Sequence, residues 1–309
     1  ALAINRYPGS RIDDLRTALS RYVDLPQGYG LMLGNGSDEL ISLLSMACQM
    51  PGASVLAPEP GFVMYAMSAK LQGLHYIPVS LRDDFELDEP AMVDAIRTHQ
   101  PAIVYLAYPN NPTANLWDVA VIKRLIAQVS AYGGWVVMDE AYQPFSPETW
   151  LHEIKRDPHA NAQVLLMRTL SKFGLAGVRI GYMLGRANVI AQLDKIRPPY
   201  NISVLNAECA LFALSHAQVF EQQAADAGLK ATKRSRRKKH VDMEQVLKET
   251  QQFAQNLPDM QAEETLNHRI ATAEVGMSGD YDSLNAEGPD NVELRDGEDN
   301  SRGAQAGKF

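Results

Sequence analysis

The sequence predicts an α/β fold with a mostly parallel sheet, and three observations support this prediction. Short apolar runs rich in β-branched residues alternate with longer segments of helical period from about residue 30 to 205. The runs are almost continuously apolar, as in strands that helices cover on both faces. Polar clusters follow three consecutive runs, and ligands bind at the carboxyl ends of strands in such sheets. We therefore expect an α/β domain with a site along one edge of its sheet.

The expected strands and helices follow one another in a regular order. The strands are the short apolar runs Ser54–Ala57, His75–Val79, Ala102–Ala107, Trp135–Asp139, Val164–Met167 and Ile180–Leu184. The helices have apolar residues at helical spacing and cover Asp38–Gln49, Phe62–Gln72, Glu89–His99, Leu116–Tyr132 and Ala187–Ile196. A further long helix is expected over Ser203–Asp226.

The composition changes near residue 230, which divides the chain into three predicted parts. We expect a large domain over residues 1–205, a connecting helix over 206–229 and a divergent polar segment over 230–309. The last part has few aromatic residues and becomes increasingly acidic, so we expect it to be largely disordered. The basic run at 233–239 is interpreted as solvated linker, because it is one short patch in an acidic chain.

The overall composition argues against several classes of protein. The chain has 309 residues, of which 46% are hydrophobic and 21% are charged, as in ordinary globular proteins. Its net charge of −8 argues against a general nucleic-acid or membrane-surface binder. No stretch approaches the ~18 apolar residues that span a bilayer, and the two cysteines lack metal-ligand spacing. We therefore expect a cytoplasmic protein that has no metal and binds neither nucleic acid nor membrane.

Lys172 and its neighbours carry the clearest chemical signal in the sequence. A lysine amine that is withdrawn from water can form a Schiff base with an aldehyde. Ser171 precedes Lys172, and Arg179 follows seven residues later. A hydroxyl and a guanidinium together suit a phosphate group. These three residues predict a site for a phosphorylated aldehyde cofactor.

Polar and aromatic residues from earlier segments could complete such a site. Asp139 ends an apolar run, where a buried carboxylate needs a partner such as a protonated ring nitrogen. Asn111 and Tyr142 could bind a phenolic oxygen, and Phe62 could stack on a flat ring. Gly34–Glu39 leads into a helix, whose first N–H groups favour an anion. Taken singly, each residue also fits a structural role, such as a helix cap, an ion pair, a tight turn or core packing.

The order of these motifs resembles that of the fold-type-I pyridoxal-phosphate (PLP) aminotransferases over about residues 4–226. The motifs are Gly-Ser-Asp-Glu, Pro-Gly-Phe-Val-Met-Tyr, Pro-Asn-Asn-Pro-Thr, Asp-Glu-Ala-Tyr, Thr-Leu-Ser-Lys and Gly-Val-Arg-Ile-Gly-Tyr. Within this family the chain is most similar to histidinol-phosphate aminotransferases, through Asn5–Pro8, Leu33–Glu39, Thr169–Tyr182 and Arg197–Asn201. The resemblance implies PLP as cofactor, an α/β/α sandwich as the large domain, and a homodimer.

The resemblance also implies a role for each candidate residue. Lys172 is the catalytic residue, which forms the Schiff base and carries a proton. Asp139 holds the protonated ring nitrogen. The other cofactor-binding residues are Asn111 and Tyr142 at the phenolic oxygen, Phe62 on the ring, Ser37, Asp38, Glu39, Thr169, Ser171 and Arg179 around the phosphate, and Tyr7 from the partner subunit.

The implied reaction converts L-histidinol phosphate and 2-oxoglutarate into imidazole acetol phosphate and L-glutamate, in histidine biosynthesis. Two departures from the family leave alternatives open. Ala114 replaces a glycine after Pro112-Thr113, and the small C-terminal domain, with its arginine for the substrate carboxylate, is incomplete or divergent. The alternatives are an aromatic aminotransferase or threonine-phosphate decarboxylase-like enzyme, and a PLP-binding protein without efficient turnover.

Overall fold

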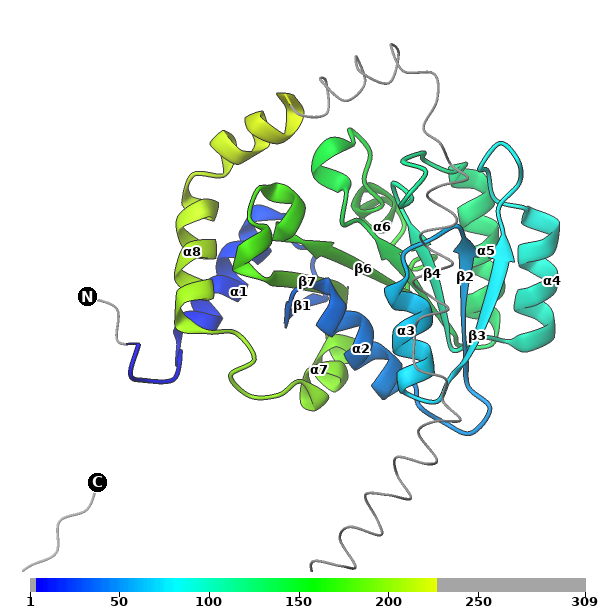
Figure 1. Ribbon diagram of the computed structural model, residues 1–309, viewed down its shortest axis with the longest axis horizontal. Helices are drawn as coiled ribbons and strands as arrows, with labels where there is room; N and C mark the ends of the chain where they lie inside the picture. Colours follow the sequence, from blue (N-terminus) through cyan, green and yellow to red (C-terminus); the bar gives the residue numbers. More distant parts are fainter. Residues whose placement is uncertain (1–3, 227–309) are drawn as a thin grey trace, which may run out of the picture. The chain divides into compact units, whose positions relative to one another are not determined.

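The computed structural model describes residues 4–226, which form a seven-stranded sheet with helices on both faces (Figure 1). The strands are β1 (Tyr29–Asn35), β2 (Ser54–Glu59), β3 (His75–Ser80), β4 (Ile103–Ala107), β5 (Trp135–Asp139), β6 (Val164–Thr169) and β7 (Ile180–Arg186). The α-helices are α1 (Arg11–Tyr22), α2 (Ser37–Ala47), α3 (Met64–Leu71), α4 (Glu89–His99), α5 (Val119–Ala131), α6 (Leu151–Arg156), α7 (Ala187–Leu193) and α8 (Val204–Ser215). Short 3-10 turns are η1 (Gln143–Phe145), η2 (Leu170–Phe173), η3 (Ala176–Val178) and η4 (Asp194–Ile196).

The sheet has the order β1-β7-β6-β5-β4-β2-β3 and is mostly parallel, as expected. β2 pairs in parallel with β3 and β4, and the pairs β4–β5 and β5–β6 are parallel too. β7 is antiparallel to both of its neighbours, β6 and β1. All six predicted strands are present, and the predicted α/β fold is confirmed.

β1 was absent from the prediction because its sequence is a poor strand former. Glycines stand at its second and sixth positions, and glycine weakens strands. The fold needs both of them. A Cβ on Gly30 would approach the Ile190 side chain to 3.1 Å, and one on Gly34 would approach Leu40 to 2.7 Å. The two glycines lower the strand propensity of β1, but they allow α7 and α2 to pack close to it.

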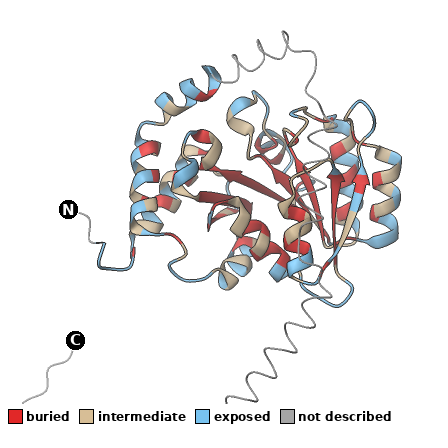
Figure 2. Ribbon diagram, viewed as in Figure 1, coloured by how far each residue is buried: buried red, intermediate tan, exposed pale blue. Residues whose placement is uncertain are grey.

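The core is divided by the sheet into two apolar layers, and successive strand residues alternate between them. One face of the sheet is covered by α1, α4, α5 and α8, whose buried residues Leu15, Ile96, Leu125 and Ala207 belong to the first layer. The other face is covered by α2, α3 and α7, through Leu40, Tyr65 and Ile190 of the second layer. In β5, Val136 and Met138 belong to the first layer and Val137 to the second. Figure 2 shows the strands buried between helices whose outer faces are exposed. This is the α/β/α sandwich that the family resemblance implied.

The expected long helix over Ser203–Asp226 is interrupted at His216. The Ser203 hydroxyl caps α8 by accepting the N–H of Asn206 at 3.1 Å, so the predicted start is correct. The Ser215 hydroxyl donates to the carbonyl of Phe212 at 2.7 Å, which competes with continued helical bonding. A second helical segment follows from 217 to 226. The predicted part over 230–309 lies outside the described residues, and the three-part division stays a prediction.

Ala114 adopts a backbone conformation that favours glycine. Its φ is 60°, in the left-handed region, and its N–H donates to the carbonyl of Asn110 at 2.8 Å. An L-residue with a Cβ pays about 1–2 kcal/mol in that region. The family glycine that Ala114 replaces would fit this turn without strain. The replacement of glycine by Ala114 therefore lowers stability locally, while the turn keeps its conformation.

We expect Ala114→Gly to raise the free energy of unfolding by about 0.5–1 kcal/mol, since relief of strain exceeds the added flexibility of the unfolded chain. Chemical denaturation measures this difference. Ala127→Gly is the matched control, because Ala127 is an exposed residue inside α5. This variant should lower the free energy of unfolding by about 1 kcal/mol, since glycine is a poor helix former. Equal losses for both variants would contradict a strained Ala114.

Candidate active site

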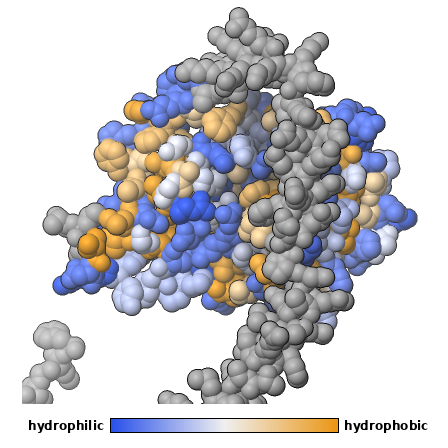
Figure 3. Space-filling view, in the orientation of Figure 1, coloured by the Kyte–Doolittle hydropathy of each residue, from blue (hydrophilic) through white to orange (hydrophobic). Residues whose placement is uncertain are grey.

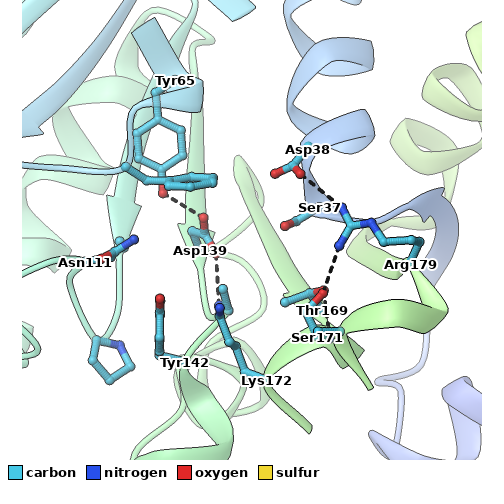
Figure 4. A pocket seen from close by; sticks show the side chains of 15 residues that line it. Ser37, Asp38, Tyr65, Asn111, Asp139, Tyr142, Thr169, Ser171, Lys172 and Arg179 are labelled. Atoms are coloured by element: carbon cyan, nitrogen blue, oxygen red, sulfur yellow. Dashed lines mark hydrogen bonds and ion pairs between the residues drawn. The ribbon is translucent and has the colours of Figure 1, made fainter. Parts of the chain in front are cut away.

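The candidate site lies at the edge of the sheet where β4, β5 and β6 end. These strands are neighbours in the sheet, so the polar residues that follow them meet. The reversal of β7 brings a fourth contribution, because Arg179, just before β7, reaches the same edge. All predicted site residues except Glu39 and Tyr7 line one pocket there (Figure 4).

Asp139 is the buried charged group of this pocket. Its side chain is only 4% exposed, and it belongs to the sheet face that α2 and α3 cover. One carboxylate oxygen accepts the Tyr65 hydroxyl at 2.7 Å, and the other accepts the N–H of Ala141 at 3.0 Å. Among residues 4–226 no cation lies within ion-pair distance of it. The carboxylate is held in place by hydrogen bonds while its charge remains uncompensated.

Burial raises the pKa of Asp139 to about 6, against the hydrogen bonds from Tyr65 and Ala141 that lower it. The nearby carboxylates of Glu140 and Asp38 raise it further. A buried carboxylate of this kind favours a cationic partner that enters the pocket, because the partner would stabilise the ionised form.

An anion cradle forms the side of the pocket where Arg179 lies. Arg179 donates from Nη1 to the Ser171 hydroxyl at 3.3 Å and from Nη2 to the Asp38 carboxylate at 3.1 Å (Figure 4). The guanidinium lies over Gly36 at the start of α2, where an added Cβ would meet Nη2 at 2.4 Å. The first N–H groups of α2, a hydroxyl and a guanidinium therefore surround one position, which suits a phosphate.

The lysine and the oxygen-binding residues lie on the other sides of the pocket. Lys172 is in η2, and its Nζ lies 5.1 Å from the centre of the Tyr142 ring. Asn111 and Tyr142 stand opposite Arg179 in Figure 4. Phe62 lines the pocket too, with its ring edge-on to Tyr65 at 5.6 Å between centroids. An amine thus lies between the anion cradle and a pair of polar groups.

Glu39 and Tyr7 do not line the pocket. The Glu39 carboxylate accepts the Asn35 N–H and the Asn201 side-chain amide, both at 2.6 Å, and so ties the α2 start to the segment before α8. Tyr7 is 74% exposed and stacks on Tyr200 at 4.1 Å between ring centroids. The predicted role of Tyr7 concerns a partner subunit, so a single chain does not test it.

The sequence prediction missed Tyr65, although it stands three residues after Phe62 in a quoted motif. Both residues fall in the helix predicted over Phe62–Gln72, where residues three apart share a face, so Phe62 could have indicated Tyr65. The prediction also missed the buried ion pair of Glu140 and Arg168, in which Arg168 Nη2 lies 2.8 Å from Glu140 Oε2. This pair joins the ends of β5 and β6 on the opposite face of the sheet.

The residues present fit a flat, phosphorylated aldehyde with a basic ring nitrogen. Asp139 would meet the nitrogen, Lys172 the aldehyde and the cradle around Arg179 the phosphate. Asp139 and Arg179 carry the charge opposite to that of the part they would meet, and the Lys172 amine reacts with aldehydes. Such a ligand would satisfy the uncompensated charge of Asp139.

Comparison with known proteins agrees with this geometry. The family described as aminotransferase class I and II matches residues 2–259. The chain belongs to this family. It is 65% identical over 226 residues to the histidinol-phosphate aminotransferase of Polaromonas naphthalenivorans, covering 73% of this chain and 61% of that protein. The chain spans about three fifths of the length of the curated relatives that it matches.

Solved structures of an aminotransferase and of a decarboxylase share the fold. The histidinol-phosphate aminotransferase from Sinorhizobium meliloti, in complex with pyridoxal-5'-phosphate, matches with a TM-score of 0.61 and 26% identity, over 71% of this chain and 59% of that one. L-threonine-O-3-phosphate decarboxylase from Porphyromonas gingivalis matches with a TM-score of 0.58 and 21% identity, over 71% and 66%. The second likeness shows the fold alone.

Two further findings concern residues 4–226 only. None of the helices in this part of the chain is long and apolar enough to cross a membrane. Nor does this part gather three or more histidine, cysteine or acidic side chains that could hold a metal ion.

We expect Asp139→Asn to stabilise the cofactor-free protein above pH 6. Below about pH 3 the carboxyl is protonated in both folded and unfolded chains and costs nothing. As the pH rises from about 4 to about 6 the carboxyl ionises in the unfolded chain but stays protonated in the folded one, so stability is lost over this window and is constant above it. The variant should therefore gain up to about 3 kcal/mol at pH 8 and only about 1 kcal/mol at pH 4.5. Urea titrations at both pH values test this, and a gain independent of pH would refute it.

Proposed function

We propose that this chain binds PLP through Lys172 and transfers the amino group of L-histidinol phosphate to 2-oxoglutarate, as a step of histidine biosynthesis. The observation that carries the proposal is the buried, uncompensated Asp139 in one pocket with Lys172 and the Arg179 cradle. Family membership and the 65% identity to a histidinol-phosphate aminotransferase support the choice of reaction.

Each part of the pocket has a distinct task in this proposal. When bound, PLP supplies a ring that withdraws electrons from the α-carbon of the amino substrate. Asp139 accepts a hydrogen bond from the protonated ring nitrogen and keeps the ring cationic. Lys172 would hold the aldehyde through Nζ, and its amine is the group that would carry the proton of the substrate α-carbon. Asn111 and Tyr142 bind the phenolic oxygen.

The phosphate end anchors the ligand without taking part in proton transfer. Ser171, Arg179 and the N–H groups at the start of α2 hold the phosphate, and Thr169 supports them by accepting the Ser171 N–H at 3.1 Å. Phe62 stacks against the ring. Fixing the phosphate and the ring nitrogen at two ends orients the aldehyde toward Lys172.

A homodimer in the cytoplasm completes the proposal. Exposed apolar side chains support an interface, since large apolar patches on a surface mark sites of association. On the face drawn in Figure 3, hydrophobic surface occurs on the side where α8 lies. The exposed large side chains in this part of the chain include Ile4, Tyr7, Tyr200, Leu205 and Phe212. In this assembly Tyr7 would contact the cofactor of the partner subunit.

A second candidate function is PLP binding without efficient turnover. It is favoured by the make-up of the pocket, which holds groups suited to a phosphate, an aldehyde and a ring nitrogen. The pocket residues all lie between Ser37 and Arg179, so the groups of one subunit that would hold PLP come from this stretch. Binding of the glutamate carboxylate would require a further cation, and within residues 4–226 the cations that line the pocket are Lys172 and Arg179.

We expect PLP to give the protein a visible absorbance band that is abolished by Lys172→Ala, because only an amine joins covalently to the aldehyde. Lys70→Ala is the matched control, since Lys70 is an exposed lysine of α3 outside the pocket. Absorbance titration with PLP measures both variants. A band that persists in Lys172→Ala, or none in the unmodified protein, would overturn the proposal.

Turnover separates the two candidate functions. An aminotransferase should release 2-oxoglutarate when the PLP-loaded protein is mixed with L-glutamate, and L-histidinol phosphate should replace glutamate as donor better than L-phenylalanine does. The carbonyl product of each mixture, which is 2-oxoglutarate, imidazole acetol phosphate or phenylpyruvate, measures both. PLP binding with no carbonyl product from any donor would favour the binding protein.

A further inference from the structure

Tyr65 is a fully buried residue that contacts Asp139 and has no task in the proposed reaction. Its hydroxyl donates to Asp139 Oδ2 at 2.7 Å, as the dashed line in Figure 4 marks. The other Asp139 oxygen is occupied by a backbone N–H, that of Ala141. Within residues 4–226, Tyr65 thus supplies the side-chain hydrogen bond of this carboxylate.

The packing of Tyr65 fixes the direction of that hydrogen bond. Its ring lies parallel to that of Tyr105 in β4, with 4.2 Å between centroids and 8° between planes. Phe62 meets the same ring edge-on, at 86°. Tyr65 is 2% exposed, so α3, β4 and the pocket wall hold it on every side. The hydroxyl cannot turn to water and remains aimed at Asp139.

The groups around Asp139 act on its charge in opposite directions. Burial disfavours the ionised form, and so do the carboxylates of Glu140, next in the chain, and Asp38 of α2. Tyr65 and the Ala141 N–H favour the ionised form. Tyr105 of β4 stays a neutral phenol, because burial raises its pKa, and Lys172 of η2 lines the pocket without an ion pair to Asp139.

Tyr65 remains a donor throughout the pH range in which Asp139 titrates. Burial, and then the Asp139 charge, raise the pKa of the Tyr65 phenol well above its ordinary value. Its O–H can therefore stabilise the carboxylate at any pH where the protein is folded. A hydrogen bond to a charged, buried acceptor is among the stronger ones in proteins.

We propose that Tyr65 is a positioning residue that keeps Asp139 ionised and aimed into the pocket, ready for a cationic ring nitrogen. The inference rests on the proposed function, because that function provides the pyridine nitrogen that Asp139 would bind. Tyr65 itself stays behind Asp139 and acts through it.

Tyr65→Phe and Tyr105→Phe form a matched pair for testing this role. Both remove one buried hydroxyl from the same stacked ring pair, but only the first removes the donor to Asp139. In the cofactor-free full chain, the Asp139 carboxyl is titrated by carbon-13 NMR and assigned by its loss in Asp139→Asn. We expect Tyr65→Phe to raise the pKa of Asp139 from about 6 to about 7 or above, and Tyr105→Phe to leave it unchanged.

PLP titration from pH 5 to 9 supplies the second measurement. Tyr65→Phe should bind PLP nearly tenfold more weakly than the unmodified protein at pH 5 and about twofold more weakly at pH 7, with the gap closing at higher pH as Asp139 ionises in both. Tyr105→Phe should follow the unmodified protein. Identical Asp139 titrations in Tyr65→Phe and the unmodified protein would overturn the inference. If the unmodified protein binds no PLP, the proposed function fails, while the carboxyl titration still decides the effect of Tyr65.

Discussion

β7 runs antiparallel to β6 and β1, and the position of Arg179 depends on that reversal. In a fully parallel sheet, residues that precede a strand lie at the edge opposite the ligand. Here the reversed strand starts at the ligand edge, so Arg179 meets Ser171 after β6 and Asp38 after β1. Close approach is possible because Gly181 has no Cβ, which would otherwise lie 2.5 Å from the Gly36 carbonyl carbon. One antiparallel strand thus assembles the anion cradle.

The alternation of side chains along β5 separates two buried charges that are adjacent in sequence. Asp139 belongs to the face covered by α2 and α3, where it meets the pocket and Tyr65. Glu140 turns to the other face and pairs with Arg168, whose guanidinium also contacts Thr149 at 2.7 Å. A buried charge is tolerated when it is paired, and removing one partner is strongly destabilising. The paired charge connects the ends of β5 and β6, while the unpaired charge of Asp139 faces the pocket.

Most of the sheet and the pocket could be predicted from the sequence, because apolar runs and the polar residues after them are local signals. β1 could not be predicted, because its glycines are required by the close packing of Ile190 and Leu40, and the local sequence does not show that packing. The sequence indicated Arg179 as a site residue because it lies near Lys172 in the chain. The reversal of β7, which brings Arg179 to the site, is seen only in the strand pairing. Tyr65 was hidden among apolar helix residues, where a tyrosine with a core role looks the same as one that holds a carboxylate.

The position of the pocket separates cofactor binding from substrate binding. Its walls come from the ends of β1, β2, β4, β5 and β6 and the start of β7, all within one continuous sheet, with Tyr65 added from α3. Asp139, Lys172 and Arg179 are therefore placed by strand pairing and core packing, before any contact with a further domain or subunit. A cation for the substrate carboxylate is not part of this sheet edge in residues 4–226. In the proposed function, the groups that would hold the cofactor are therefore placed mainly by this sheet, whereas turnover would depend on groups that the sheet does not place.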